Sequence, residues 1–153
     1  MNKSKELLIE EEILQKIPVL NAFGVEVEKL SQDECWVRIP LEPNHNHKGT
    51  AFGGSLYAVS IAACYALLYK SQKDACVVNW DLVIAKGEVE YLAPVQFDFY
   101  VVAKMNFSKW EAVVRKLQKN QKPGRLNIKA EVRVQRDGPA LCIFNGEFAF
   151  VPQ

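Results

Sequence analysis

The sequence predicts an α+β fold in which a long antiparallel sheet curls over one central apolar helix, with an extra helix between two later strands. An apolar, alanine-rich run at residues 53–70 follows a glycine turn, which indicates a helix buried on most of its circumference. Segments of alternating polarity lie before and after this run. A helix of this length and character requires a sheet wrapped around it, so we expect an α+β layer.

One helix and one β-hairpin are predicted before the central helix. Residues 5–17 place their isoleucines and a leucine on one helical face, and Pro18 follows the end of this segment. Residues 24–31 and 34–41 alternate in polarity and flank a short polar turn, which is typical of a hairpin. A polar loop with three glycines then leads into the central helix.

Two strands are predicted directly after the central helix. Residues 77–91 are dense in valine, isoleucine, tryptophan and tyrosine, and Gly87 within them marks a bulge or a close contact. Pro94 ends this strand, and residues 96–106 form the next one.

The extra helix and two further strands complete the chain. Ser108 and Glu111 have the spacing of a capping box, and Pro123 and Gly124 end the helix. An apolar stripe follows the cap at helical spacing: Trp110, Val113, Val114 and Leu117. Clean alternation then predicts a strand at 126–135, and a turn at Asp137-Gly138 leads to the last strand, at 140–151.

Size and composition fit one globular domain over residues 1–153. Apolar residues make up 49% and charged residues 24% of the chain, and the net charge is +1. This balance gives no signal for nucleic acid or for an anionic membrane as a partner. No phosphate-binding loop occurs in the sequence, and we expect no cofactor.

The cysteines and the first residues indicate a cytoplasmic protein. The four cysteines lie far apart without a CxxC pair, so we expect reduced thiols and neither disulfides nor a zinc site. The N-terminal stretch carries three consecutive glutamates and no apolar signal segment. The apolar run at 56–69 is short for a membrane span.

Charge is unevenly distributed, since residues 108–125 hold six basic residues and one acid, Glu111. A solvated helix face is the ordinary explanation of such a run. The alternative is a local anion site that pairs with the phosphates of coenzyme A or with an acidic carrier protein.

Two motifs resemble those of a known family. The loop NHKGTAFGG at residues 46–54, followed by an apolar helix, resembles the glycine-loop signature of hotdog-fold acyl-CoA thioesterases of the phenylacetate-pathway type. The segment GEVEYLAP at 87–94 resembles the strand that this family places after its helix. The resemblance covers residues 20–151, and the chain is most similar to the thioesterase domain that follows a GNAT-type acetyltransferase in some bacteria.

The resemblance implies a homodimer, or a dimer of dimers, in which two sheets join edge to edge and the thioester site lies between subunits. The substrate would be a thioester of coenzyme A or of an acyl carrier protein. The amides at Gly53 and Gly54 would hold its carbonyl oxygen, and an amide donor of this kind stabilises developing negative charge. Phe52, His47, Ser55 and Ser60 would contact the substrate.

The sequence departs from the family at two positions. Phe52 stands where the family usually has histidine, directly before the glycine pair. Ile61 stands where the family has the aspartate or glutamate that acts as base or nucleophile, and no carboxylate occurs between Pro43 and Asp74. The usual hydrolytic groups are therefore missing from their usual places.

Asp81 is the candidate for a relocated base that activates water, since its strand can reach the partner's glycine loop in a hotdog dimer. The alternative is a structural aspartate that bonds to backbone or caps a helix of the other subunit. Asn46 would orient water or the thioester carbonyl, or would serve only the turn that contains it.

The remaining polar residues are weaker candidates. His45 and His47 alternate but have no evident third ligand, so a metal is not expected, and either is a general base or a solvated loop residue. Ser60 and Cys64 share a helical face without a base in reach, which favours packing for the thiol and a lining role for the hydroxyl.

Three functions remain open from the sequence. The first is a thioesterase that hydrolyses acyl-CoA or acyl-carrier thioesters. The second is a non-catalytic domain that binds acyl-CoA, as the missing histidine and carboxylate suggest. The third is a dehydratase or hydratase, which the same absences weaken most because that chemistry needs both a proton donor and an acceptor.

Overall fold

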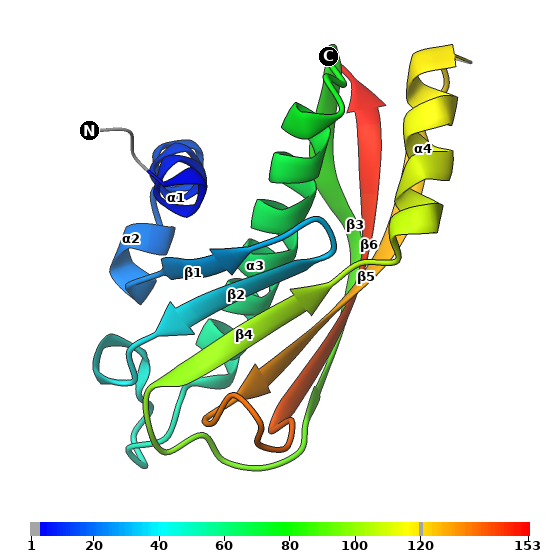
Figure 1. The fold of residues 1–153 in the computed structure, drawn as a ribbon. Helices are drawn as coiled ribbons and strands as arrows, with labels where there is room; N and C mark the ends of the chain where they lie inside the picture. The colour runs from blue at the N-terminus through cyan, green and yellow to red at the C-terminus, as the bar shows by residue number, and fades with distance from the viewer. Residues whose placement is uncertain (1–3, 120) are drawn as a thin grey trace.

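The computed structural model describes residues 4–119 and 121–153, so the start of the N-terminal stretch and residue 120 of the basic segment lie outside it. The elements follow the predicted order, with two short helical additions (Figure 1). Their bounds are α1 Lys5–Lys16, α2 Leu20–Phe23, β1 Glu26–Leu30, β2 Glu34–Ile39, the 3-10 turn η1 Glu42–Asn44, α3 Gly53–Asp74, β3 Trp80–Tyr91, β4 Phe99–Lys104, α4 Phe107–Lys119, β5 Gly124–Arg133 and β6 Cys142–Pro152.

The strands form one antiparallel sheet in the order β1-β2-β4-β5-β6-β3. The sheet curls around α3, so that β1 and β2 lie on one side of the helix and β3 and β6 on the other (Figure 1). β3 forms one edge of the sheet, and within the described residues it pairs only with β6. The predicted α+β fold with a central helix is confirmed.

Helix α3 forms the centre of the core because nearly all its faces are apolar. Val59, Ala63, Cys64 and Leu67 have no measurable exposure. The sheet meets them with the inward residues of its alternating strands, among which Phe99, Phe144 and Phe150 are fully buried. The helix extends to Asp74, four residues beyond its predicted end, because polar residues 71–74 continue its last turn after the apolar run stops.

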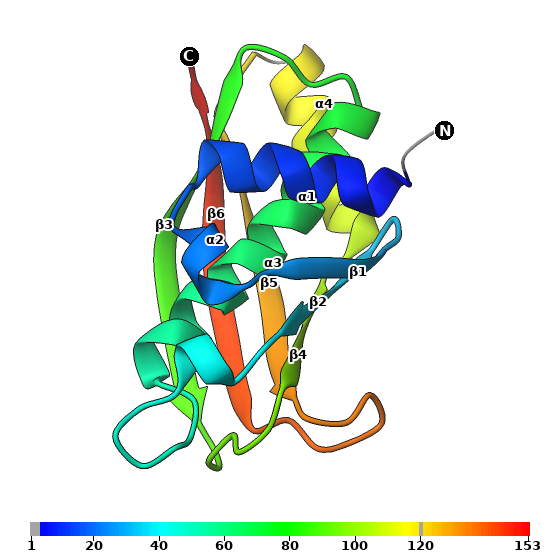
Figure 2. The same cartoon turned by 90° about the vertical axis from the view of Figure 1, so that its left-hand side faces the viewer.

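Helix α1 lies across the C-terminal half of α3 (Figure 2). Its buried face carries Ile9 and Ile13, as the apolar spacing predicted. Two contacts tie its polar side to α3: the Lys5 ammonium lies 2.9 Å from the Asp74 carboxylate, and Lys73 lies 2.6 Å from Glu12. α1 is therefore held at the same end of α3 at which β3 begins.

Helix α4 packs against β5 on the buried face of that strand, the face that also meets α3 (Figure 1). The predicted apolar stripe is confirmed, since Trp110, Val113 and Leu117 are buried and the Trp110 ring lies 5.5 Å from that of Phe150. The predicted capping box is wrong. The backbone N–H of Lys109 donates to the Asn106 side chain at 3.0 Å, so the helix begins one residue before Ser108.

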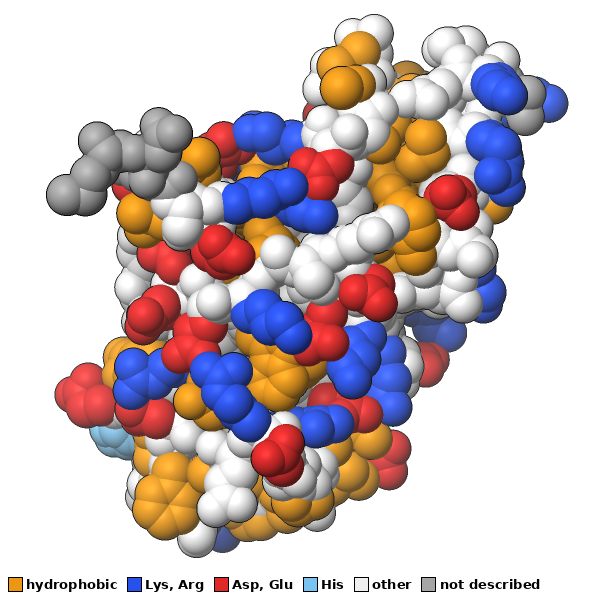
Figure 3. Space-filling model, in the orientation of Figure 1, with side chains coloured by type: hydrophobic (Ala, Val, Ile, Leu, Met, Phe, Trp, Pro, Cys, Tyr) orange, Lys and Arg blue, Asp and Glu red, His pale blue; other side chains and the backbone are white. Residues whose placement is uncertain are grey.

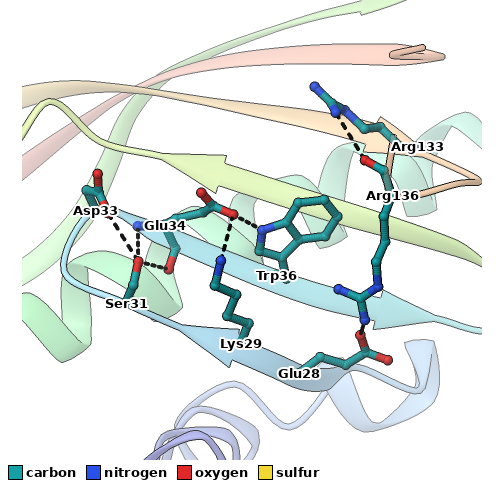
Figure 4. Close-up of polar contacts among 8 residues, drawn as sticks. All are labelled: Glu28, Lys29, Ser31, Asp33, Glu34, Trp36, Arg133 and Arg136. Atoms are coloured by element: carbon teal, nitrogen blue, oxygen red, sulfur yellow. Dashed lines mark hydrogen bonds and ion pairs between the residues drawn. The ribbon is translucent and has the colours of Figure 1, made fainter. Parts of the chain in front are cut away.

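The outer face of the sheet carries a paired polar network (Figure 4). The Arg136 guanidinium pairs with Glu28 and lies over the rings of Trp36 and Tyr100, 5.4 and 4.7 Å from their centroids. Strand alternation directs these side chains away from α3. The space-filling view shows oppositely charged side chains interspersed over this region (Figure 3). The network stabilises the sheet on the side opposite the core.

Candidate functional site

The N-terminus of α3 presents backbone N–H groups without acceptors. Phe52 occupies the N-cap and its side chain makes no capping hydrogen bond. The first hydrogen bond of the helix runs from the Leu56 N–H to the Phe52 carbonyl. Within residues 4–119 and 121–153, no group accepts from the N–H of Gly53, Gly54 or Ser55. These donors are available to an oxygen atom of a ligand.

Two backbone bonds fix where this helix begins. The Phe52 N–H donates to the Asn44 carbonyl at 2.7 Å, and the Ala51 N–H donates to the Val95 carbonyl at 2.8 Å. The Asn44 side chain is 1% exposed and donates to the carbonyls of Phe23 and Pro40. Sequence reasoning did not single out Asn44, which links α2, the end of β2 and the start of α3.

Asn46 organises the loop that precedes the helix. Its side-chain oxygen accepts from the N–H groups of Lys48 and Thr50, at 2.8 and 3.2 Å, and its amide donates to the Thr50 hydroxyl at 3.0 Å. Gly49 has a φ of +75°, which favours glycine. Of the two alternatives for Asn46, these contacts support turn chemistry, and a contact with substrate stays a prediction.

Tyr91 closes one side of the helix N-terminus. Its hydroxyl donates to the Gly53 carbonyl at 2.8 Å, and its ring lies against Gly53, where a Cβ would come within 3.2 Å of the hydroxyl oxygen. Burial, with smaller effects from Cys142 and Tyr57, raises the pKa of Tyr91 above its ordinary value, so the hydroxyl remains a donor at neutral pH. The sequence motif at 87–94 contains this residue, but its position on a strand gave no sign of this contact.

Phe52 covers the other side of the glycine pair. Its side chain is 57% exposed, and its ring lies so close to Gly54 that a Cβ there would approach the ring within 2.4 Å. Gly54 is therefore required for this position of the ring. Phe52 supplies an apolar surface where the resemblance implies an imidazole, so it offers contact with a substrate but no proton transfer.

A pocket of about 470 Å³ opens at this point. It is lined by the glycine pair, by Tyr91 and by the segment that follows β3: Thr50, Ala51, Gly53, Gly54, Leu56, Tyr91, Leu92, Ala93, Pro94 and Val95. Leu92 is 49% exposed. Apolar walls with a few backbone donors suit an apolar ligand that carries a hydrogen-bond acceptor better than a charged ligand.

One half-buried stripe runs along α3 from the glycine pair to the far end of the helix. It consists of residues at helical spacing whose side chains are neither fully buried nor fully exposed: Tyr57, Ala58, Ile61, Tyr65 and Tyr69. Ile61, at the position where the family has a carboxylate, lies in the middle of the stripe. The stripe carries no acid, so a hydrolytic base must come from another element.

A second pocket, of about 530 Å³, lies at the other end of the stripe. Tyr65, Trp80 and Asp81 are among the residues that line it. The exposed Asp81 carboxylate accepts from the Gln153 side chain at 3.1 Å. Burial, and in second place the nearby Asp81 charge, raise the pKa of Tyr65.

Within one chain, Asp81 and the glycine pair lie far apart. Asp81 is at the start of β3 and Tyr91, which contacts Gly53, is at its end. Ten residues of extended strand span roughly 33 Å. Asp81 therefore cannot act on a ligand held by the glycine pair of its own chain.

The remaining predicted residues are separate from the pocket or lack free groups. The Ser60 hydroxyl is fully buried and donates to the Leu56 carbonyl at 2.7 Å, so it has no lining role in this chain. Ser55 is buried beside the glycine pair, and His47 is exposed in the preceding loop. Burial raises the pKa of the Cys64 thiol well above its ordinary value, which fits packing rather than nucleophilic attack.

Edge strand β3 exposes apolar side chains. Val83 and Ile84 are 42% and 38% exposed, and the strand's outer hydrogen-bonding groups face away from β6. Long apolar edges of this kind pair readily with another strand.

Two further findings concern metal binding and membrane crossing by the described residues. No group of three or more histidine, cysteine, aspartate or glutamate side chains gathers there in a way that would hold a metal ion. None of the described helices combines the length and apolar character needed to cross a membrane.

A curled antiparallel sheet around one helix, with free amides at the start of that helix, defines a hotdog-fold protein of the thioesterase type. The chain belongs to the family described as "Putative thioesterase (yiiD_Cterm)", whose model matches residues 6–152. This confirms the resemblance to the hotdog-fold thioesterase superfamily. Among curated proteins, no match was found.

Solved structures share the fold. The chain is similar to a protein of unknown function from Chlorobaculum tepidum TLS, with 22% identity, a TM-score of 0.87 and coverage of 97% of this chain and 94% of that chain. It is similar to a "putative thioesterase" from Shewanella oneidensis, with 22% identity, a TM-score of 0.78 and coverage of 96% and 97%. A "Probable Thioesterase" from Pseudomonas aeruginosa has 16% identity, a TM-score of 0.82 and coverage of 100% and 99%.

Proposed function

We propose that this protein hydrolyses acyl thioesters of coenzyme A or of an acyl carrier protein. The observation that carries the proposal is the set of free N–H groups at Gly53, Gly54 and Ser55, which open into an apolar pocket beside Tyr91. Backbone donors of this kind stabilise the oxyanion that forms when a thioester carbonyl is attacked. Membership of a thioesterase family supports the same reaction.

The active form is a homodimer in this proposal. The apolar edge of β3 offers the surface for a second copy, and antiparallel pairing about the middle of the strand places residues near its start opposite residues near its end. Asp81 of one copy then lies beside Tyr91 and the glycine pair of the other. The two groups can then act on the same ligand, although roughly 33 Å separates them within one chain.

Asp81 is the general base in this arrangement. Its carboxylate takes a proton from a water molecule while the water oxygen attacks the thioester carbon, and the carbonyl oxygen becomes an oxyanion held by the amides of Gly53 and Gly54. The C–S bond then breaks as the carbonyl reforms. The thiolate takes up a proton, so the products are a carboxylic acid and a free thiol.

The acyl chain lies along the half-buried stripe of α3. Ile61 gives this path an apolar midpoint, and Phe52 covers its entrance. The test is a panel of substrates. Release of free thiol is measured with acyl-CoAs and acyl carrier proteins of increasing chain length. Turnover above background on at least one of them is expected, and its absence from every member in an intact dimer contradicts the proposal.

A non-catalytic acyl-CoA-binding role is the second candidate. Two observations favour it: Phe52 and Ile61 replace the usual proton-transfer groups, and the stripe on α3 carries no carboxylate. Such a protein would gain thermal stability with acyl-CoA while leaving the thioester intact. Measuring unfolding temperature and thiol release in the same samples separates the two functions.

A further inference from the structure

The solvent side of α4 carries cations without partners. Lys109, Arg115, Lys116 and Lys119 of α4, together with Lys122 in the segment that follows it, make no ion pair with any carboxylate in the described part of the chain. Most lysines and arginines on the other elements are paired, among them Lys5, Lys29, Arg38, Lys73, Arg125 and Arg136. We call the five unpaired residues the basic face of α4.

The geometry of α4 keeps the four cations of the helix itself on one side. Lys109, Arg115 with Lys116, and Lys119 recur at spacings that return to the same side of a helix, and the first and last are about 15 Å apart along its axis. The opposite side is fixed to the sheet by Trp110, Val113 and Leu117. The space-filling view shows basic side chains along the outer side of this helix (Figure 3).

The basic face lies near the end of the molecule at which Asp81 is found. The Gln118 side chain donates to the Ala75 carbonyl at 2.8 Å, which joins the last turn of α4 to the end of α3. Cys76, Val78 and Asp81 line the pocket at this same end, and Val78 is 69% exposed. Both views of the ribbon place α4 beside this end of α3 (Figures 1 and 2).

We propose that the basic face of α4 docks an acidic acyl carrier protein, so that the thioester reaches the site on a protein rather than on free coenzyme A. This inference rests on the proposed function and names its substrate class. A rigid row of unpaired cations complements an acidic helix of similar length. Its position beside the second pocket lets a flexible prosthetic arm enter there and reach the glycine pair of the second copy.

The test compares two double variants with the unaltered chain. Lys116→Gln with Lys119→Gln removes two charges from the basic face. Lys104→Gln with Lys129→Gln removes two lysines that face each other across β4 and β5, away from α4, and is the matched control. Each protein is titrated with the holo form of an acidic acyl carrier protein. Its kcat/KM is then measured on octanoyl carrier protein and on octanoyl-CoA.

We expect the α4 variant to bind the carrier about tenfold more weakly than the unaltered chain and to show a flatter dependence on salt. Its kcat/KM should fall about tenfold with octanoyl carrier protein and stay within about twofold with octanoyl-CoA. The control variant should match the unaltered chain on every measure.

The docking proposal would be overturned by results of two kinds, in carrier binding and in turnover. In binding, either unchanged affinity for the carrier in the α4 variant or no binding by the unaltered chain would contradict it. In turnover, an equal loss of kcat/KM on octanoyl-CoA would contradict it and would assign the cations to coenzyme A phosphates. Carrier binding without hydrolysis of either substrate would support the docking surface and contradict the proposed reaction, so the two failures are distinguishable.

Discussion

The hydroxyl of Tyr91 donates a hydrogen bond of 2.8 Å to the carbonyl oxygen of Gly53. This carbonyl belongs to the same planar peptide unit as the N–H of Gly54, so a contact that fixes the one also directs the other. Donation to the carbonyl also polarises the unit and strengthens its N–H as a donor. Tyr91 is therefore a positioning residue for the proposed oxyanion donor.

Tyr91→Phe removes this hydrogen bond and keeps the ring. A loss of about 1 kcal/mol of transition-state stabilisation corresponds to a fall of roughly fivefold in kcat. KM should change by less than about twofold, because the effect acts on developing charge rather than on the bound substrate. Steady-state kinetics check this result. Tyr100→Phe, on the outer face of the sheet, is the control, and an equal loss in both variants would contradict the assignment.

Gly54 and Gly146 both lack room for a Cβ, but the neighbours that would have to move differ. At Gly54 the obstacle is the exposed ring of Phe52, whereas at Gly146 it is the buried rings of Phe144 and Phe148. We expect Gly146→Ala to lower the free energy of unfolding by about 1–3 kcal/mol. Gly54→Ala should lower the free energy of unfolding by less than this and should instead reduce the rate of thiol release. Chemical denaturation and kinetics on both variants check the contrast, and a larger stability loss at Gly54 would refute it.

Asp81→Asn keeps the shape of the side chain and removes its basicity. If Asp81 activates water, kcat falls by at least about a hundredfold while the dimer and its unfolding temperature are retained. Asp137→Asn, in the turn between β5 and β6, is the matched control. Full activity in the Asp81 variant would leave the thioesterase class standing but would require a different base.

The sequence predicted the fold well because the periodicity of each long element reflects its burial. The alternation at 126–135 and the apolar run at 53–70 located β5 and α3 with end shifts of a few residues. The short helices α2 and η1 were missed, since segments of this length carry too few residues for a periodic signal. The cap of α4 was misplaced because Asn106 and Ser108 are both favourable N-cap residues.

The site was only partly predictable. The glycine pair and Phe52 could be located because glycines before an apolar run mark a helix start with free amides. Tyr91 and Asn44 were missed, since their contacts join segments that are distant in the sequence. The relation of Asp81 to the glycine pair depends on a second copy, and no pattern within one chain reports the register of such a pairing.

A substitution on edge strand β3 tests whether a second copy brings Asp81 to the glycine pair. Ile84→Lys places a charge in the middle of the exposed side of β3, where a second copy would bury it. We expect a monomer by light scattering and a loss of nearly all thiol release, with the fold retained by circular dichroism. Val19→Lys changes another exposed apolar residue, at the start of α2, and should leave a dimer. A dimer that persists in the Ile84 variant would exclude pairing along β3.

The contact between Glu12 and Lys73 predicts a defined pH dependence of stability. The hydrogen bond from Lys73, followed by that from Tyr69, holds the pKa of Glu12 below its ordinary value of 4.5. A carboxylate whose folded pKa is depressed stabilises the fold fully above its unfolded pKa and loses this effect as pH falls through the folded value. Glu12→Gln should therefore lower the unfolding temperature at pH 7 by about 2–4 °C.

The same difference should shrink as the pH falls below about 4.5, the ordinary pKa of the Glu12 carboxyl, and should vanish below its lower folded pKa, where the unaltered side chain is neutral as well. Thermal unfolding across this range measures it. Glu111→Gln, on α4, is the control and should show little difference at either end. A gap between the Glu12 variant and the unaltered chain that stays constant with pH would mean that packing, and not the charge on Glu12, holds α1 against α3.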